Sequence, residues 1–207
     1  SVLAVCFFSF SLSQVKALTE DGREVVLLDD KTWRFVNESD NDILDEITTN
    51  NNVFVKSKDA TFLLKSKIID AGIYINPKKW KPISKDIIPT SEYLFQNINN
   101  PQSLAVVISE IAPIPNLKSL KNIVISNIQS RVSFFRLLNS EYRTINGIET
   151  LYLKYKANVK GLDFTYASVY YLTDEGYMSI MSYAYDKDFF SEENEINNFI
   201  NGIVKTT

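Results

Sequence analysis

The chemistry open to this chain is limited first by what its sequence lacks. None of its 207 residues is histidine, which excludes Ser-His-Asp and Cys-His nucleophile systems and the usual imidazole ligands of zinc. Carboxylates remain, and a glycosidase-like pair could be drawn from five of them: Glu110, Glu141, Glu149, Asp163 and Glu175. Such residues more often lie at turns and exposed edges. With only 6 glycines and no phosphate loop, nucleophile elbow or metal-ligand spacing, we expect no catalysis, no cofactor and no metal.

Aromatic side chains are the residues that could carry a binding function. They recur at alternating positions near the C-terminal end of the chain: Tyr155, Phe164, Tyr166, Tyr183 and Tyr185. A partly uncovered band of this kind could bind an apolar ligand, a sugar ring or a partner protein, because tyrosine joins broad apolar contact to a polar tip. However, Tyr and Phe are common in β-strands in general, including strands that bind no ligand. We therefore favour cross-strand packing under a helix, where each pair contributes roughly 0.2–1 kcal/mol.

Residues 141–185 must position this band, and they read as an antiparallel meander. Asn146-Gly147 suits a two-residue type I′ turn, Lys160-Gly161 can close a second hairpin, and residues 173–176 can form a third turn. These turn lengths set Tyr166 opposite both Tyr155 and Tyr183. The pattern predicts a phenolic face on one side of the sheet. The other side is expected to carry smaller apolar residues: Ala167, Val169, Met178, Ile180 and Ala184. Both faces are apolar, so we expect cover on both.

Two helices are expected to provide this cover. The first begins after Asn116 as its cap, and its apolar residues recur at three- and four-residue steps until the helix ends at Asn139-Ser140: Leu117, Leu120, Val124, Ile128, Val132 and Phe135. The second is capped by Ser191, with Glu192, Glu193 and Glu195 in its first turn. Its expected buried stripe is Phe190, Ile196, Phe199, Ile200 and Ile203.

Further strands are indicated before the first helix, at residues 60–67, 73–76, 92–96 and 103–110. Pro77 ends the second of these strands. We expect Trp80 to close the end of the core with its indole N–H hydrogen-bonded. Together with the meander, these segments predict a sheet of about six strands.

The N-terminal residues divide into three parts. Residues 1–13 match the apolar region of a secretory signal whose beginning is missing. Acylation of Cys6, as in a lipoprotein, is the less favoured interpretation. Residues 14–36 are expected to form a small β-hairpin module, with turns at Asp21-Gly22 and at residues 29–31 and with Trp33 and Phe35 on one face. Such a unit must dock on something because an isolated hairpin is marginal in water. Residues 37–52 read as an acidic, Asn-rich linker, so the main domain is expected to span residues 53–207.

Composition narrows the class of partner. The formal charge of -3 and the pI near 5.1 argue against nucleic acid. The hydrophobic content of 45% supports one packed domain. We expect an exported protein, periplasmic or secreted, with no stable transmembrane span once the signal is removed.

The order of parts resembles a known family. These parts are strands ending in Pro77 and Trp80, an apolar strand at 105–108, a long helix, the Asn146-Gly147 hairpin, a long meander and a closing helix with Phe199 and Ile203. In the order of these parts the chain resembles the PsbP-like fold. That family includes a photosystem extrinsic subunit, a Ran-binding nuclear factor and bacterial envelope proteins such as the DcrB lipoproteins. The resemblance covers about residues 53–204. It implies an α+β sandwich, an antiparallel sheet flanked by helices, and a non-catalytic binding or assembly role without catalytic residues.

Two functions follow as expectations. The first is a protein-interaction or assembly module of the bacterial envelope, with an unknown envelope protein as partner and the Trp33 and Phe35 hairpin as its docking element. The alternative is a carrier of a small apolar or sugar ligand. It predicts a closed, mostly apolar cavity beside Tyr166.

Overall fold

The computed structural model of the 207-residue chain describes residues 15–20, 23–28, 30–39 and 41–206. The expected signal segment 1–13, with Cys6, lies outside the described residues, as does the expected turn at residues 21–22. The rest of the chain forms three sheets and three α-helices among the described residues, together with a short 3₁₀ helix at Lys85–Ile87.

The main sheet has eight strands in the order β4-β10-β11-β12-β13-β9-β8-β7, not the six or so predicted. All neighbours are antiparallel except β4 and β10. In chain order the strands are β4 (Thr48–Phe54), β7 (Trp80–Pro82), β8 (Tyr93–Asn97), β9 (Leu104–Ile111), β10 (Phe134–Ile145), β11 (Ile148–Val159), β12 (Leu162–Leu172) and β13 (Gly176–Tyr185). The strands not predicted are β4 and β7 at the two edges, and both are too polar or too short to show a two-residue period. The predicted strands at residues 60–67 and 73–76 do form, but they pair with each other in a separate sheet.

The register of the meander is as predicted. Tyr155 faces Tyr166, and Tyr166 faces Tyr183 across the next strand pair. The two hairpin turns have the left-handed backbone that their residues favour, with φ of 49° and 80° at Asn146 and Gly147. Lys160-Gly161 forms the second turn with similar angles of 52° and 85°. Turn chemistry therefore determines which side chains share a face.

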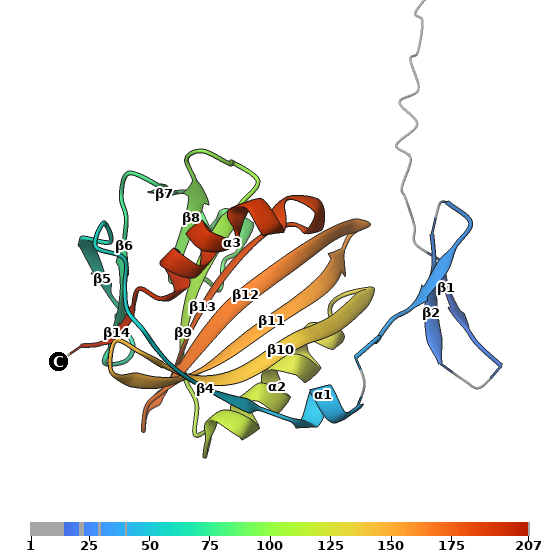
Figure 1. The fold of residues 1–207 in the computed structure, drawn as a ribbon, viewed down its shortest axis with the longest axis horizontal. Helices are drawn as coiled ribbons and strands as arrows, with labels where there is room; N and C mark the ends of the chain where they lie inside the picture. Colours follow the sequence, from blue (N-terminus) through green and yellow to red (C-terminus); the bar gives the residue numbers. More distant parts are fainter. Residues whose placement is uncertain (1–14, 21–22, 29, 40, 207) are drawn as a thin grey trace, which may run out of the picture.

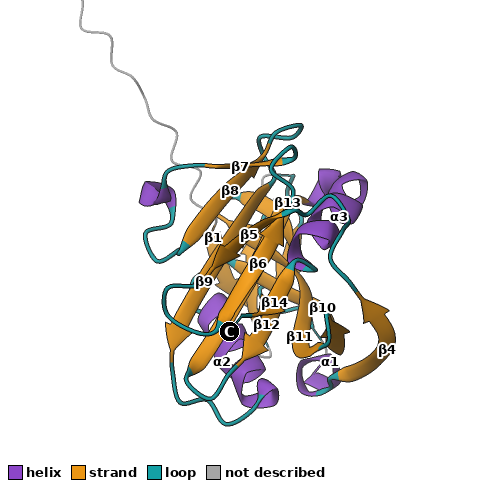
Figure 2. Ribbon diagram, turned by 90° about the vertical axis from the view of Figure 1, so that its left-hand side faces the viewer, coloured by secondary structure: helices purple, strands orange, loops and turns teal. Residues whose placement is uncertain are grey.

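Each face of the main sheet has its own cover (Figure 1). Helix α2 (Leu117–Gln129) packs on the phenolic face, where Leu120 meets Leu151 and Tyr155 in one buried cluster. The opposite face is covered by helix α3 (Asp186–Ile200) and by a second sheet in the order β14-β6-β5, which lies in front of the main sheet in Figure 2. Its strands are β5 (Phe62–Lys65), β6 (Ala71–Ile75) and β14 (Ile203–Lys205). The α+β sandwich is confirmed.

The first helix is shorter than predicted. Asn116 caps it as expected, accepting a hydrogen bond from Ser119 N at 2.8 Å, but it ends at Gln129 and the strand β10 begins at Phe134. The prediction failed because Phe135 continues the helical spacing although it is a strand residue. Pairing of residues 134–145 with β11 satisfies the backbone of this segment in the sheet.

The last helix begins earlier than predicted, at Asp186, because Asp186 and Asp188 supply the acidic first turn that was assigned to later residues. Ser191 is not its cap, since its hydroxyl donates to the Asp188 carbonyl inside the helix at 2.7 Å. The buried phenylalanine is therefore Phe189, which is 4% exposed, and not Phe190, which is 90% exposed.

The segment expected to be a linker is partly structured. Helix α1 (Asn41–Asp45) is followed by β4 from Thr48, which lies beside β10. The sequence does not show this strand because its side chains are mostly solvent-exposed on the sheet edge. At the opposite edge, Trp80 is 1% exposed and its indole N–H donates to Glu195 Oε1 at 3.2 Å, as predicted.

Candidate functional site

A small three-stranded sheet at the N-terminal end is the first candidate site. It contains β1 (Val15–Leu18), β2 (Glu24–Leu27) and β3 (Trp33–Phe35), in that order. The sequence predicted turns at residues 21–22 and 29–31, which separate these three strands, and β2 pairs with β1 on one side and with β3 on the other. We call this sheet the N-terminal β unit. In Figure 1 it stands to one side of the main sheet.

One row of apolar side chains crosses the N-terminal β unit and faces solvent. Val15 pairs with Leu27, and Leu27 pairs with Trp33. The three residues are 57%, 43% and 54% exposed. Phe35, two residues further along the same face, is half-buried and meets the Trp33 ring edge-on at 5.2 Å. Both aromatic residues named from the sequence therefore lie on one face, and Trp33 is the exposed member.

The N-terminal β unit is attached to the main sheet through a short stretch after β3. The Val36 carbonyl accepts a hydrogen bond from Phe135 N at 2.6 Å, and Glu38 N donates to the Phe135 carbonyl at 3.3 Å. Ser39 Oγ accepts from Leu137 N. These bonds close the part of the β10 edge that β4 does not reach.

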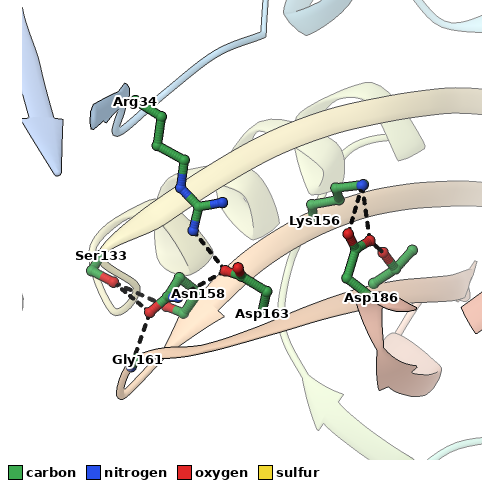
Figure 3. Close-up of polar contacts among 8 residues, drawn as sticks. Arg34, Ser133, Lys156, Asn158, Gly161, Asp163 and Asp186 are labelled. Atoms are coloured by element: carbon green, nitrogen blue, oxygen red, sulfur yellow. Dashed lines mark hydrogen bonds and ion pairs between the residues drawn. The ribbon is translucent and has the colours of Figure 1, made fainter. Parts of the chain in front are cut away.

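Arg34 adds a side-chain contact to this attachment (Figure 3). Its guanidinium donates to Asp163 Oδ1 at 2.6 Å and lies 3.9 Å from the Phe134 ring centre. Asn158 Nδ2 donates to the same carboxylate oxygen at 2.8 Å. Asp163 was named from the sequence as a candidate catalytic carboxylate. In the structure its carboxylate contacts the Arg34 guanidinium and the Asn158 side-chain amide.

We predict that replacing Arg34 with methionine loosens the N-terminal β unit without unfolding the main sheet. The change removes the ion pair while retaining an apolar side chain beside Phe134, and a half-exposed pair of this kind contributes at most about 1 kcal/mol. Hydrogen exchange should become faster at residues 34–38 and stay unchanged in β12. Unchanged exchange at residues 34–38 would show that the backbone bonds alone hold the unit.

The phenolic band is the second candidate site, and its inner part is packed. Tyr155 stacks on Tyr166 with ring centres 4.8 Å apart and planes 8° apart, and Tyr166 meets Tyr183 at the same distance. Tyr155 is 3% exposed and Tyr166 is 9% exposed. Burial raises the pKa of both phenols. This part of the band has the packing role favoured from the sequence.

The outer end of the band is more open. Phe164, Tyr183 and Tyr185 are only half-buried. Phe164 stacks on Tyr185 at 4.8 Å and meets Tyr183 edge-on at 5.6 Å. A cavity of about 500 Å³ adjoins Tyr185, where β13 passes into α3.

The remaining candidate carboxylates lie at the ends of strands, in a strand and in a turn. Glu110, at the end of β9, accepts from the Tyr177 hydroxyl at 2.8 Å. Glu141, on β10, accepts from Asn139, Asn50 and Arg143, and although burial acts to raise its pKa, these hydrogen bonds lower it. Glu149 and Glu175 are exposed. In the described part of the chain, no three His, Cys, Asp or Glu side chains come together as a group that could hold a metal ion.

A buried lysine was not anticipated from the sequence. Lys121, in α2, is 1% exposed, and its ammonium donates to the Glu46 carbonyl at 2.6 Å, just after α1. Burial lowers its pKa. The only available signal was its position between Leu120 and Val124, next to the predicted apolar stripe. It holds the start of β4 against α2.

Comparison with known proteins identifies the fold. No protein-family model matches the chain, and no curated protein matches it. Among solved structures, cyanobacterial PsbP (CyanoP) from Synechocystis sp. PCC 6803 is similar over 72% of this chain and 94% of its own, with a TM-score of 0.52 and 12% identity. The chain thus has a PsbP-like fold.

Two further structures are less similar. A protein from Bacteroides thetaiotaomicron VPI-5482 has a TM-score of 0.47 and 12% identity, over 72% of this chain and 49% of its own. A putative regulator of unknown function from Pseudomonas aeruginosa has a TM-score of 0.43 and 11% identity, over 65% of this chain and 91% of its own.

Within the described residues, no helix combines the length and the apolar character needed to cross a membrane.

Proposed function

We propose that this protein is a non-catalytic interaction or assembly module of the bacterial cell envelope, and that it docks on an envelope protein through the N-terminal β unit. The proposal includes export of the chain and a relation to envelope proteins of the DcrB type. The observation that carries it is the exposed row of Val15, Leu27 and Trp33. Three large apolar side chains in one exposed row do not contribute to the packing of the small sheet, and contiguous exposed apolar side chains of this kind mark interaction sites.

The chemistry of this row suits a protein partner. Tryptophan is the residue type most enriched among those that dominate binding energy at interfaces, and it acts best when apolar neighbours exclude water around it. Leu27 and Val15 are placed to do this for Trp33. A cleft of about 660 Å³ adjoins Phe35, with Arg23, Arg136, Glu24 and Glu38 among its lining residues. It offers polar contacts of both signs at the rim of the apolar row.

We predict that replacing Trp33 with serine abolishes partner capture. Loss of a central tryptophan typically costs 2 kcal/mol or more, or about 30-fold in affinity. The test uses the full chain as bait in an envelope extract, with Phe190→Ser as the matched control because Phe190 is 90% exposed but lies on α3. Equal recovery of the same partner by wild type and by Trp33→Ser would refute docking through this row.

The carrier function is a second candidate, and a cavity other than the one expected from the sequence supports it. The rings beside Tyr166 are in contact with one another. The cavity adjoining the band lies instead beside Tyr185.

A further inference from the structure

The cavity beside Tyr185 has the composition of a small binding site. It measures about 500 Å³ and is lined by Leu162, Asp163, Tyr185, Asp186 and Lys187. Three of these residues follow one another where β13 becomes α3, and two follow the turn between β11 and β12. The site therefore lies where β12 begins and β13 ends, close to the contact of Arg34 with Asp163 (Figure 3).

The aromatic wall of the cavity is fixed in place. Tyr185 stacks on Phe164 with planes 20° apart, and Phe164 in turn meets Tyr183 at 88°. A ring held in this way loses little conformational freedom when a ligand packs on it. Leu162, which is 49% exposed, extends the apolar surface.

The two carboxylates are also held in place by contacts within the protein. Asp186 accepts hydrogen bonds from Lys156 at 2.9 Å and from Thr165 at 2.5 Å, and Asp163 accepts from Arg34 and Asn158 (Figure 3). Although burial acts to raise the pKa of Asp186, these hydrogen bonds lower it, so it stays a carboxylate at neutral pH. Asp163 is half-exposed, with its side chain at 49%.

The charge of the site argues against a cationic ligand. Each of the two carboxylates already has a cationic partner, Arg34 or Lys156, and Lys187 is a third cationic residue among those that line the cavity. An ammonium ligand would therefore meet paired carboxylates and a like charge. A neutral ligand rich in hydroxyls can stack a face on Tyr185 and share donors and acceptors with Asp163, Asp186 and Lys187 without competing for either ion pair.

From this geometry we infer that the cavity binds a neutral pyranose unit, with one sugar face on the Tyr185 ring and hydroxyls on the Asp163 carboxylate and the Lys187 ammonium. The inference rests on the second candidate function, the carrier, and is independent of docking through Trp33. It predicts weak, ring-dependent binding, because a single stacked sugar makes few contacts.

The test is saturation-transfer NMR of the full chain with a panel of neutral sugars: maltose, cellobiose, lactose and maltohexaose. At least one is expected to bind wild type with a Kd in the millimolar range or tighter. Tyr185→Phe should retain binding because it keeps the ring, and Tyr185→Ala should weaken it at least about tenfold. Stronger binding of maltohexaose than of maltose would show that the site prefers a sugar unit within a glycan chain. Equal binding of the two would indicate a free sugar as the ligand.

Controls separate this site from general surface effects. Phe190→Ala changes an exposed ring on α3 that does not line the cavity, and it should leave sugar binding unchanged. If Tyr185→Ala fails to fold, Leu162→Asp tests the same wall at an exposed position and should also weaken binding. The inference is overturned if no sugar binds wild type at concentrations of about 10 mM, if Tyr185→Ala binds as wild type does, or if tetramethylammonium displaces the sugar.

Discussion

Replacing Phe189 with alanine is expected to lower the free energy of unfolding by about 3–5 kcal/mol, whereas the same change at the adjacent Phe190 should alter it by less than about 0.5 kcal/mol. Phe189 is 4% exposed and belongs to the buried cluster that joins α3 to the main sheet, with Ile196 and Phe199. Its removal leaves a cavity in that cluster. Phe190 projects into solvent, at 90% exposed.

Urea denaturation of the two variants and of wild type measures this difference. Each variant has lost the same atoms, so composition and helix propensity cancel between them and only burial differs. The sequence assigned the buried position to Phe190. Equal destabilisation by the two substitutions, or a larger effect at Phe190, would contradict the start of α3 at Asp186.

The second large effect is a loss of stability above pH 10, caused by buried phenols. Burial raises the pKa of Tyr152 from 10.0 to about 12, and it also raises the pKa of Tyr155, Tyr166 and Tyr170. The unfolded chain releases these protons near pH 10, whereas the folded chain retains them. Stability is therefore fully present below pH 10 and falls as the pH rises toward the folded values.

The size of this effect follows from the shift itself. At about 1.4 kcal/mol per unit of pKa, Tyr152 alone removes about 2.7 kcal/mol once the pH exceeds its folded value. The other phenols add to this loss, and domains are typically stable by only about 5–15 kcal/mol. Lys121 acts in the opposite direction, since burial lowers its pKa below 10.5. The stability that is gained as Lys121 loses its proton is therefore fully present near pH 10.5, where the loss caused by the phenols begins.

Denaturant midpoints at a series of pH values from 7 to 12, read together with tyrosinate absorbance, measure this prediction. We expect phenol ionisation and unfolding to occur together in one cooperative step. Gradual ionisation of most tyrosines near pH 10, in a chain that remains folded, would show that the phenolic band is open to solvent.

The sequence predicted the meander well because short turns impose register. The residues of Asn146-Gly147 and Lys160-Gly161 favour the left-handed backbone that two-residue turns need, and the face of every later side chain follows from the turn lengths. It failed where a tertiary contact overrides local periodicity. Phe135 fits both a helix stripe and a buried strand, and only pairing with β11 decides between them.

The candidate sites were predicted in part for similar reasons. Alternation placed Trp33 and Phe35 on one face, but the row of Val15, Leu27 and Trp33 depends on the register of three strands, which the sequence did not predict. The band of rings was found from the same alternation. Among the described residues, the closed apolar cavity expected beside Tyr166 is absent there, because the neighbouring rings and α2 pack against Tyr166. The open cavity beside Tyr185 is a different feature, which alternation does not predict.

Site-specific photo-cross-linking tests the proposed docking function most directly. A photoreactive residue is placed in the full chain at position 27, inside the exposed row, and in a separate chain at position 190, on α3. Irradiation in the native envelope should join position 27 to one discrete partner, which Trp33→Ser in the same chain removes, and should give no such product from position 190. The same products from both positions, or none from position 27, would contradict docking through the N-terminal β unit.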